Sequence, residues 1–271
     1  MILPGSYANG FAPRDNQPLY PELWHGCVSA VAPCLGPTGL TVRDWGAKKQ
    51  PATLTNCDPS VVWKVGDGKY CFGGDGTNDY IALGDFGALP SKGMISFWAY
   101  TTSIGFFLNM FGTNAFSSNS KGFRFEVANS SGVVSAVVGD DTGVFPSSAS
   151  SIGIGTIPLS KWTHFALKWS VTDSLLVSYF NGAQFTTSSN SFWVANLTDV
   201  RLGQGFSSTR CWAGLLDDCR IYFGEVPASV PRRLASRRGI AYELAPRRRS
   251  RAAVITSGFS ALRPSILRGS R

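Results

Sequence analysis

Charged residues are scarce in this chain, at 15% of its 271 residues, where soluble proteins average about a quarter. Hydrophobic residues reach 44%, and there are 30 glycines, with serine and threonine also frequent. The hydrophobic content excludes a disordered chain, because disordered segments bury too little apolar surface to fold. The many turn-forming residues disfavour a helical bundle. The composition therefore predicts an all-β protein with many turns.

Long apolar runs are also missing. No stretch approaches the roughly 18 consecutive apolar residues of a membrane-spanning helix, so we expect no membrane insertion. The first residues, MILPGSYANGFAPRDN, lack the basic start and apolar centre of a secretory signal. Without export, disulfides are not expected, and no C-x-x-C pair indicates a zinc site. We therefore expect reduced thiols at all six cysteines, Cys27, Cys34, Cys57, Cys71, Cys211 and Cys219.

Residues suited to acid–base catalysis are few, with two histidines and four glutamates. A glycosidase needs two carboxylates at a defined separation across the scissile bond. Glu126 lies in a predicted strand and has no acidic partner nearby in the sequence. His164, flanked by aromatic residues, fits a half-buried structural role, and no G-x-S-x-G elbow is present. The sequence therefore predicts that the protein is not an enzyme.

Acidic residues almost disappear from the C-terminal end, where arginine is concentrated. Residues 232–271 hold eleven arginines and one acid, a net charge of +10, whereas the first 231 residues hold 14 basic and 16 acidic residues, a net charge of −2. A segregated basic segment indicates an anionic partner. Docking to a protein is favoured, because aliphatic residues separate the arginines, while nucleic-acid contact and a solvated tail stay open. We assign residues 240–271 to an extended assembly arm with Arg247, Arg248, Arg249, Arg251, Arg263, Arg268 and Arg271.

Alternation of apolar and polar residues becomes regular from Val61 onward, which is typical of half-buried strands. Asn181-Gly182 predicts a hairpin with a type I′ turn. One short helix is expected over 229–239, with Ser229 as its N-cap and Gly239 at its C-terminal end. About a dozen short strands at close spacing predict an antiparallel β-sandwich of the jelly-roll type. They are expected over 27–32, 40–44, 61–65, 70–74, 79–84, 94–102, 105–113, 122–129, 133–139, 162–170, 175–182, 199–205 and 212–224.

Two stretches, 70–102 and 162–230, carry a series of motifs in a fixed order. These are Gly74-Asp75-Gly76 followed by Asp79-Tyr80, Ser96-Phe97-Trp98, Trp162-Thr163-His164-Phe165-Ala166, Tyr179-Phe180-Asn181-Gly182, Leu202-Gly203, and Gly214-Leu215-Leu216-Asp217-Asp218 followed by Arg220-Ile221-Tyr222. The series resembles the laminin-G-like branch of the concanavalin A-like lectin/glucanase superfamily. The resemblance covers roughly residues 20–240 and implies a jelly roll with lectin-like or structural roles. Glucanases of that superfamily use an E-x-D-x-x-E strand, which this chain lacks, and Gly74 stands where the family often has phenylalanine.

The two ends of the chain are similar to the flanks of laminin-G-like proteins encoded by tailed phages and environmental viral genomes. This second resemblance implies a non-enzymatic virion component, such as a capsid decoration, fibre or appendage protein. Residues 1–20 would be an N-terminal extension, residues 21–239 a sandwich displayed outward, and residues 240–271 the arm that docks it to the particle.

The partners expected for a virion component are other virion proteins, further copies of the same chain and host-surface glycans, with nucleic acid less favoured. Its expected location is the virion, assembled in the host cytoplasm. The alternative is a cellular carbohydrate-binding module, cytoplasmic or extracellular, whose basic arm binds an acidic polymer. Affinity for nucleic acid that falls steeply with salt would favour this alternative.

Oxygen-bearing side chains gather at two places. Asp75, Asn78 and Asp79 surround one turn, and Asp217 and Asp218 lie near the end of the predicted sandwich. Such ligands suit Ca²⁺, which many members of the resembled family bind. The same residue types cap turns and bind neighbouring backbone by themselves. The structural role is favoured, and calcium is the one cofactor that stays open.

Sugar-binding sites use exposed aromatic side chains, and the sequence offers eight tryptophans. Those at 98, 162, 169 and 212 fall on predicted strands, so most are assigned to the core. Trp193 lies in the polar stretch SNSFWVANLT, with Phe192 beside it. We therefore predict carbohydrate contacts at Phe192 and Trp193.

Overall fold

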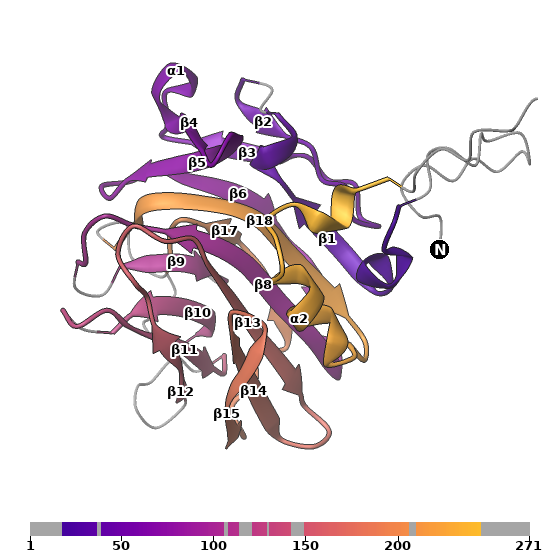
Figure 1. The fold of residues 1–271 in the computed structure, drawn as a ribbon. Coiled ribbons are helices and arrows are strands. Elements are labelled where there is room, and N and C mark those ends of the chain that lie inside the picture. Colours follow the sequence, from indigo (N-terminus) through magenta and orange to yellow (C-terminus); the bar gives the residue numbers. More distant parts are fainter. Residues whose placement is uncertain are drawn as a thin grey trace, which may run out of the picture.

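The computed structural model describes residues 18–36, 39–105, 108–113, 121–128, 130–141, 149–205 and 210–244. They form two antiparallel sheets that face each other across a hydrophobic core (Figure 1). The helical segments in this part of the chain are short: η2 (Pro21–Trp24), η3 (Pro33–Leu35), α1 (Pro59–Val62), α2 (Ser229–Leu234) and η4 (Ile240–Tyr242).

The first sheet has the order β15-β14-β13-β8-β18-β5-β4, and β1 also pairs with β18. We call it the covered sheet, because α2 lies across its outer face (Figure 1). Its strands are β1 (Cys27–Val31), β4 (Trp63–Gly66), β5 (Lys69–Asp75), β8 (Lys92–Tyr100), β13 (Thr163–Ser170), β14 (Leu175–Phe180), β15 (Ala183–Ser189) and β18 (Ala213–Phe223).

The second sheet has the order β12-β11-β10-β9-β17-β6-β3-β2. A ribbon of β7 (Gly87–Ala88) and β16 (Asn196–Leu197) stands apart from it. The strands of the second sheet are β2 (Thr41–Val42), β3 (Ala52–Thr55), β6 (Tyr80–Gly84), β9 (Asn109–Gly112), β10 (Gly122–Val127), β11 (Val133–Gly139), β12 (Ala149–Thr156) and β17 (Val200–Leu202).

The main core fills the space between the sheets with side chains at alternate strand positions. Phe97 of β8 is at its centre, with ring centroids 6.2 Å from Phe111, 5.0 Å from Phe125 and 5.9 Å from Phe165. Phe97 and Phe165 come from the covered sheet, and the other two from the second sheet. All four rings are buried, so burial of aromatic surface joins the two sheets.

A second, smaller core lies on the outer face of the covered sheet. The helix α2 packs Val230 and Leu234 in one cluster with Met94 and Tyr222 of the sheet. The Tyr222 hydroxyl donates to the Leu23 carbonyl at 2.9 Å, which ties η2 to β18. Segments near both ends of the described chain therefore cover this face.

The all-β sandwich predicted from the sequence is confirmed, and most expected strands lie close to their expected bounds. The turn at Asn181 and Gly182 has φ values of 49° and 79°, as a type I′ turn requires. The strand expected over 61–65 is only partly correct, because its first two residues belong to α1. Asp58 caps that helical turn by accepting a hydrogen bond from the Ser60 backbone at 2.8 Å.

The helix expected over 229–239 is shorter than predicted. It ends at Leu234, and Ala228 occupies the N-cap position, so Ser229 is its first residue. The chain then returns to the sheet, where the Gly239 N–H donates to Asp218 at 3.3 Å. Sequence alternation also missed β3, β12 and β15, whose threonine, serine and glycine residues give weak apolar contrast.

The first residues of the predicted arm belong to the fold, since Ile240 and Ala241 are buried in the second core. The arginines assigned to the arm, from Arg247 to Arg271, lie outside the described residues, as do residues 1–17 of the predicted N-terminal extension. Among the helices that the structure describes, none combines the length and apolar content needed to cross a bilayer.

All six cysteines lie in the described residues, and none of them forms a disulfide there. Burial raises the pKa of Cys27 and of Cys57 to about 12. These two thiols therefore stay protonated at neutral pH and are poor nucleophiles.

Two hairpin turns, Asp67-Gly68 and Asn181-Gly182, provide a matched test of packing. Gly182 and Gly68 both have positive φ, but only a Cβ at Gly182 would meet another element, at 2.8 Å from the Arg232 Cα on α2. We expect Gly182→Ala to lower the free energy of unfolding by at least about 1 kcal/mol more than Gly68→Ala, whose cost is backbone strain of about 1–2 kcal/mol. Urea unfolding of both variants measures this difference, and equal losses would show that α2 does not pack on the turn.

Candidate functional site

A buried polar cluster lies beside the second core on the outer face of the covered sheet. Strand register places Trp98 of β8 between His164 and Asp217, and Ser96 opposite Arg220. These five residues, which we call the polar cluster, are all buried. Within the described residues, the atoms without a hydrogen-bond partner include Ser96 Oγ, Trp98 Nε1, His164 Nδ1 and both terminal nitrogens of Arg220. So many orphaned polar atoms in one place mark a functional or hydrated region.

The predicted acidic pair Asp217 and Asp218 holds the segments that cover the sheet. Asp217 Oδ1 accepts hydrogen bonds from the Cys34 N–H at 3.0 Å and the Asp218 N–H at 2.8 Å. Asp218 Oδ1 accepts from Arg220 Nε at 2.8 Å, and its other oxygen accepts from the Gly239 N–H. Both carboxylates therefore have structural partners within the chain.

The other predicted acidic group forms a separate turn. Asp75 Oδ1 accepts from the backbone N–H groups of Thr77 at 2.7 Å, Asn78 at 3.2 Å and Asp79 at 3.4 Å. Asp75 lies opposite the first residue of β18, roughly 13 Å along that strand from Asp217. The two groups do not form one site, and the described ranges contain no cluster of three His, Cys, Asp or Glu side chains that could hold a metal ion. Calcium binding stays a prediction.

A hollow opens at one end of the outer face of the covered sheet, and we call it the tryptophan hollow. It has a volume of about 340 Å³, at the lower end of the roughly 300–1,000 Å³ typical of ligand sites. It lies where the segment after α2 meets the β4–β5 hairpin and the ends of β8 and β13. Its walls are Asp67, Lys69, Trp98, Trp162, Arg237 and Arg238.

Arg238 links the tryptophan hollow to the polar cluster. Its guanidinium lies 4.0 Å from the ring centre of Trp162, which is half-buried. One terminal nitrogen donates to the Gly66 carbonyl, and Lys69 Nζ donates to the Arg238 carbonyl at 2.6 Å. The other terminal nitrogen, Nη1, is 3.3 Å from Asp217 Oδ2 but makes no hydrogen bond with the described residues. This nitrogen is therefore a buried donor at the edge of a cavity.

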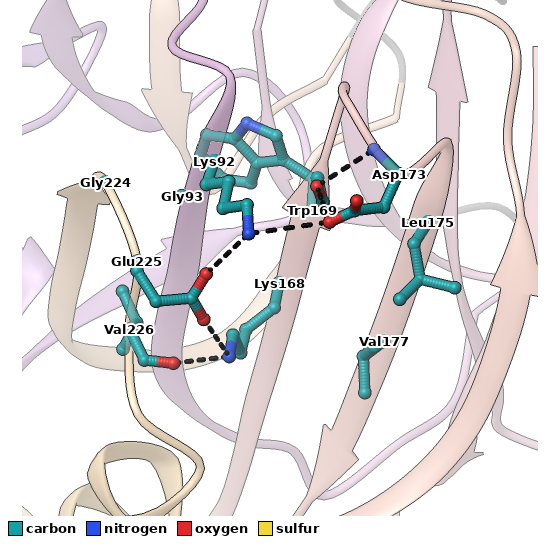
Figure 2. A pocket seen from close by; sticks show the side chains of 11 residues that line it. Lys92, Gly93, Lys168, Trp169, Asp173, Leu175, Val177, Gly224, Glu225 and Val226 are labelled. Atoms are coloured by element: carbon teal, nitrogen blue, oxygen red, sulfur yellow. Dashed lines mark hydrogen bonds and ion pairs between the residues drawn. The ribbon is translucent and has the colours of Figure 1, made fainter.

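A second hollow, the lysine hollow, lies farther along the same sheet and is smaller, at about 140 Å³. Figure 2 shows Lys92 between two carboxylates, with Nζ 3.0 Å from Glu225 and 3.5 Å from Asp173. Lys168 pairs with Glu225 at 3.4 Å and also donates to the Val226 carbonyl. Two lysines and two carboxylates neutralise one another here, so the lysine hollow is a poor candidate for a charged ligand.

The aromatic pair predicted to bind carbohydrate lies in neither hollow. Trp193 is partly buried against the main core, and the Phe192 carbonyl accepts a hydrogen bond from Asn190 Nδ2 at 2.6 Å. Their role stays a prediction. The aromatic wall that sequence reasoning missed is Trp162, because alternation placed it on a strand with the core tryptophans. It stands just before β13, and no local pattern shows that the covering segment leaves a hollow beside it.

A comparison with protein families matches residues 75–229, more than half of the chain, to the concanavalin A-like lectin/glucanases superfamily. The chain belongs to this superfamily. The match runs from the last residue of β5 to the first residue of α2, so it includes most of both sheets and both tryptophans of the hollow. The resemblance carried by the sequence motifs is confirmed.

Solved structures similar to this superfamily member include one domain of an arabinanase and the binding domains of several toxins. Domain 4 of AbnA, an extracellular arabinanase from Geobacillus stearothermophilus, has a TM-score of 0.58 and 16% identity over 77% of this chain and 98% of that domain. The receptor-binding domain of botulinum neurotoxin mosaic serotype C/D has a TM-score of 0.58 and 12% identity, over 78% of this chain and 50% of that chain.

The binding domain of Paraclostridial Mosquitocidal Protein 1 has a TM-score of 0.55 and 14% identity, over 79% of this chain and 52% of that chain. The chain thus spans about half the length of the two toxin domains. Identities this low show a shared fold. No curated protein sequence matches the chain.

The superfamily also contains glucanases, so the surroundings of the carboxylates bear on whether they are available for catalysis. Glu126, the strand glutamate, is buried in an ion pair with Arg124, at 2.8 Å from Nε and 3.2 Å from Nη2. Glu225 is engaged by two lysines in the lysine hollow. Both carboxylates therefore have structural partners among the described residues.

Two buried groups of the polar cluster have opposite effects on stability as the pH changes. Burial, with repulsion from Asp218, raises the pKa of Asp217 to about 7, although Arg238 opposes the rise. Burial and the nearby Arg220 charge lower the pKa of His164 to about 3. Between about pH 4 and 6.5, both are neutral when folded and charged when unfolded. The Asp217 contribution to stability falls as pH rises through this range, and the His164 contribution rises.

Removing one of these groups should expose the effect of the other. Relative to the natural protein, we expect Asp217→Asn to gain stability with rising pH, by up to about 1.4 kcal/mol per pH unit between about pH 4.5 and 6.5. His164→Gln should change in the opposite direction. Urea unfolding at three pH values tests both, and parallel stability profiles for all three proteins would contradict the assignment.

Proposed function

We propose that this protein is a non-catalytic glycan-binding module and that the tryptophan hollow is its saccharide site. The observation that carries the proposal is the pairing of an aromatic wall with buried, unused donors. Trp162 supplies the half-buried ring, with the Arg238 guanidinium 4.0 Å from its centre. Trp98 Nε1 has no hydrogen-bond partner among the described residues, and Arg238 Nη1 has only the Asp217 carboxylate at 3.3 Å. A sugar has apolar C–H faces and polar edges, so it can pack on such a ring and accept from such donors.

The similar structures support the proposal at the level of fold. Domain 4 of AbnA is described in complex with arabinotriose. The binding domain of botulinum neurotoxin DC, with a TM-score of 0.55 and 10% identity over 79% of this chain and 52% of that chain, is described in complex with SialylT. Those ligands belong to those proteins, and they illustrate that domains of this fold serve as binding modules without being the whole enzyme or toxin.

The more specific part of the proposal is a role in a phage virion. Its support is the resemblance of the chain ends to viral laminin-G-like proteins and the strong positive charge of residues 232–271. In this role the sandwich faces outward to bind host-surface glycans, and the arginine-rich segment docks to particle proteins. A cellular module with a polymer-binding arm is the alternative, and both share the glycan-binding sandwich.

Two tryptophans provide a matched test of the site. We expect Trp162→Ala to abolish binding to the glycans that the natural protein recognises on an array, because it removes the wall of the hollow. Trp193→Ala removes the aromatic residue that the sequence favoured, and it should leave binding unchanged. Thermal melting of both variants checks that each is folded. Loss of binding in Trp193→Ala alone would place the saccharide site at Trp193. If the natural protein binds no glycan on the array, the proposal is refuted.

The docking role of the arm can be tested in the full chain. We expect the natural protein to form oligomers at low salt, and a variant with Arg247, Arg248, Arg249 and Arg251 replaced by glutamine to stay monomeric. The physical reason is loss of guanidinium contacts to carboxylates on neighbouring copies. Light scattering coupled to size exclusion measures the mass of each. Identical masses would refute self-association through these four arginines.

A further inference from the structure

The charge of the tryptophan hollow distinguishes it from the lysine hollow. Its walls carry three cationic groups, Lys69, Arg237 and Arg238, and one carboxylate, Asp67. In the lysine hollow, by contrast, two lysines meet two carboxylates, and each lysine lies within 4 Å of a carboxylate (Figure 2). Arg238 has Asp217 at 3.3 Å and Arg237 pairs with Glu243, both behind the walls, so the tryptophan hollow differs in having mostly cationic groups on its lining.

The unused hydrogen-bonding atoms of the tryptophan hollow are donors. Trp98 Nε1 is buried and makes no hydrogen bond within the described residues, and Arg238 Nη1 is buried with only an ion-pair contact to Asp217 at 3.3 Å. The indole and guanidinium groups have no acceptor atoms. Trp98 and Arg238 are 7% and 6% exposed, so water reaches these donors poorly. An unmade hydrogen bond at such a group costs free energy, which a suitable ligand atom would recover.

Arg237 places a third donor group at the rim. Its side chain is 60% exposed and pairs with Glu243, which is itself only partly buried. An exposed pair of this kind contributes little to stability, so the guanidinium can exchange partners at small cost. Arginine offers a planar fork that matches a carboxylate with two parallel hydrogen bonds.

The ligand that fits the unmatched indole donor and the exposed Arg237 fork is rich in acceptors. The hydroxyl groups of a neutral sugar can accept from these donors, but each also brings an O–H donor that the indole and guanidinium groups cannot accept. A carboxylate only accepts, at two oxygens, and can replace Glu243 as the partner of the exposed Arg237 fork. We infer that the tryptophan hollow binds an acidic saccharide, with the sugar ring against Trp162 and the carboxylate held by Arg237, Arg238 and the Trp98 N–H. This inference rests on the proposed function and names its ligand class.

The experiment compares three soluble probes on the full chain by isothermal titration. The first is an oligogalacturonate, the second is the same oligosaccharide with its carboxylates reduced to alcohols, and the third is poly-glutamate. We expect the oligogalacturonate to bind at least about tenfold more tightly than either of the others. Poly-glutamate also reports attraction to the arginine-rich end of the chain, because it is acidic but not a sugar.

Single substitutions then locate the contact. Arg237→Gln should weaken oligogalacturonate binding by about tenfold and leave the reduced oligosaccharide unaffected, and Trp98→Phe should weaken oligogalacturonate binding more than binding of the reduced oligosaccharide. Lys92→Gln removes one positive charge from the lysine hollow and should leave both affinities unchanged. Because Arg237 is at the surface, its substitution is not expected to disturb the fold, and a melting curve checks this.

The outcomes separate the inference from the proposed function. Equal affinity for the acidic and reduced oligosaccharides would overturn the acidic-sugar inference and leave a glycan-binding module in place. Equal affinity for oligogalacturonate and poly-glutamate would overturn both, since the protein would then recognise charge and not sugar. Equal losses in Arg237→Gln and Lys92→Gln would overturn the placement in the tryptophan hollow.

Discussion

The ion pair between Asp218 and Arg220 on β18 is the interaction on which the outer face of the covered sheet depends. Its Oδ1–Nε distance is 2.8 Å, and the two side chains are 1% and 0% exposed. An arginine this deeply buried is costly unless its charge is compensated. Trp24 and Tyr242 complete the compensation, with ring centres 4.7 and 4.6 Å from the guanidinium. Segments from both ends of the described chain are thereby brought over one strand.

A local irregularity of β18 makes this arrangement available. The register of β18 against β8 shifts between Asp217 and Arg220, and Asp218 has a φ of 46°. A bulge places consecutive side chains on the same face of a strand, so two neighbouring carboxylates point to the outer face together. Asp218 holds Arg220 and the Gly239 backbone, while Asp217 lies beside Arg238. The wall of the tryptophan hollow therefore depends on the bulge.

The two hollows on the outer face of the covered sheet show that buried polar groups point to a ligand only when the protein itself leaves them without a partner. In the lysine hollow, each charged group is paired with another, so the arrangement needs no ligand. In the tryptophan hollow, the Trp98 indole N–H is removed from water without a hydrogen-bond partner among the described residues, and Arg238 Nη1 has only an ion-pair contact with Asp217 at 3.3 Å. Orphaned donors carry a free-energy cost, which makes them better indicators of a binding site than cavity size alone. The proposed glycan site follows from this contrast.

Much of the fold could be predicted from local patterns. The strand expected over 133–139 coincides with β11, and the Asn181-Gly182 pair forms the expected turn. Both depend on neighbouring residues alone, since alternation and positive φ act over a few positions. The motif series also identified the superfamily. Patterns failed in β12 and β15, where serine, threonine and glycine residues give little contrast between the two faces.

The sequence by itself determined the all-β class, the superfamily, the scarcity of catalytic residues and the charge of the C-terminal end. Only the tertiary structure decided that Trp162 and not Trp193 stands in a hollow, and that Asp217 faces Arg238. The physical reason is separation along the chain: Arg238 bonds to Gly66 across 172 positions. Contacts of that range follow from the packing of the whole sandwich, and no local pattern encodes them.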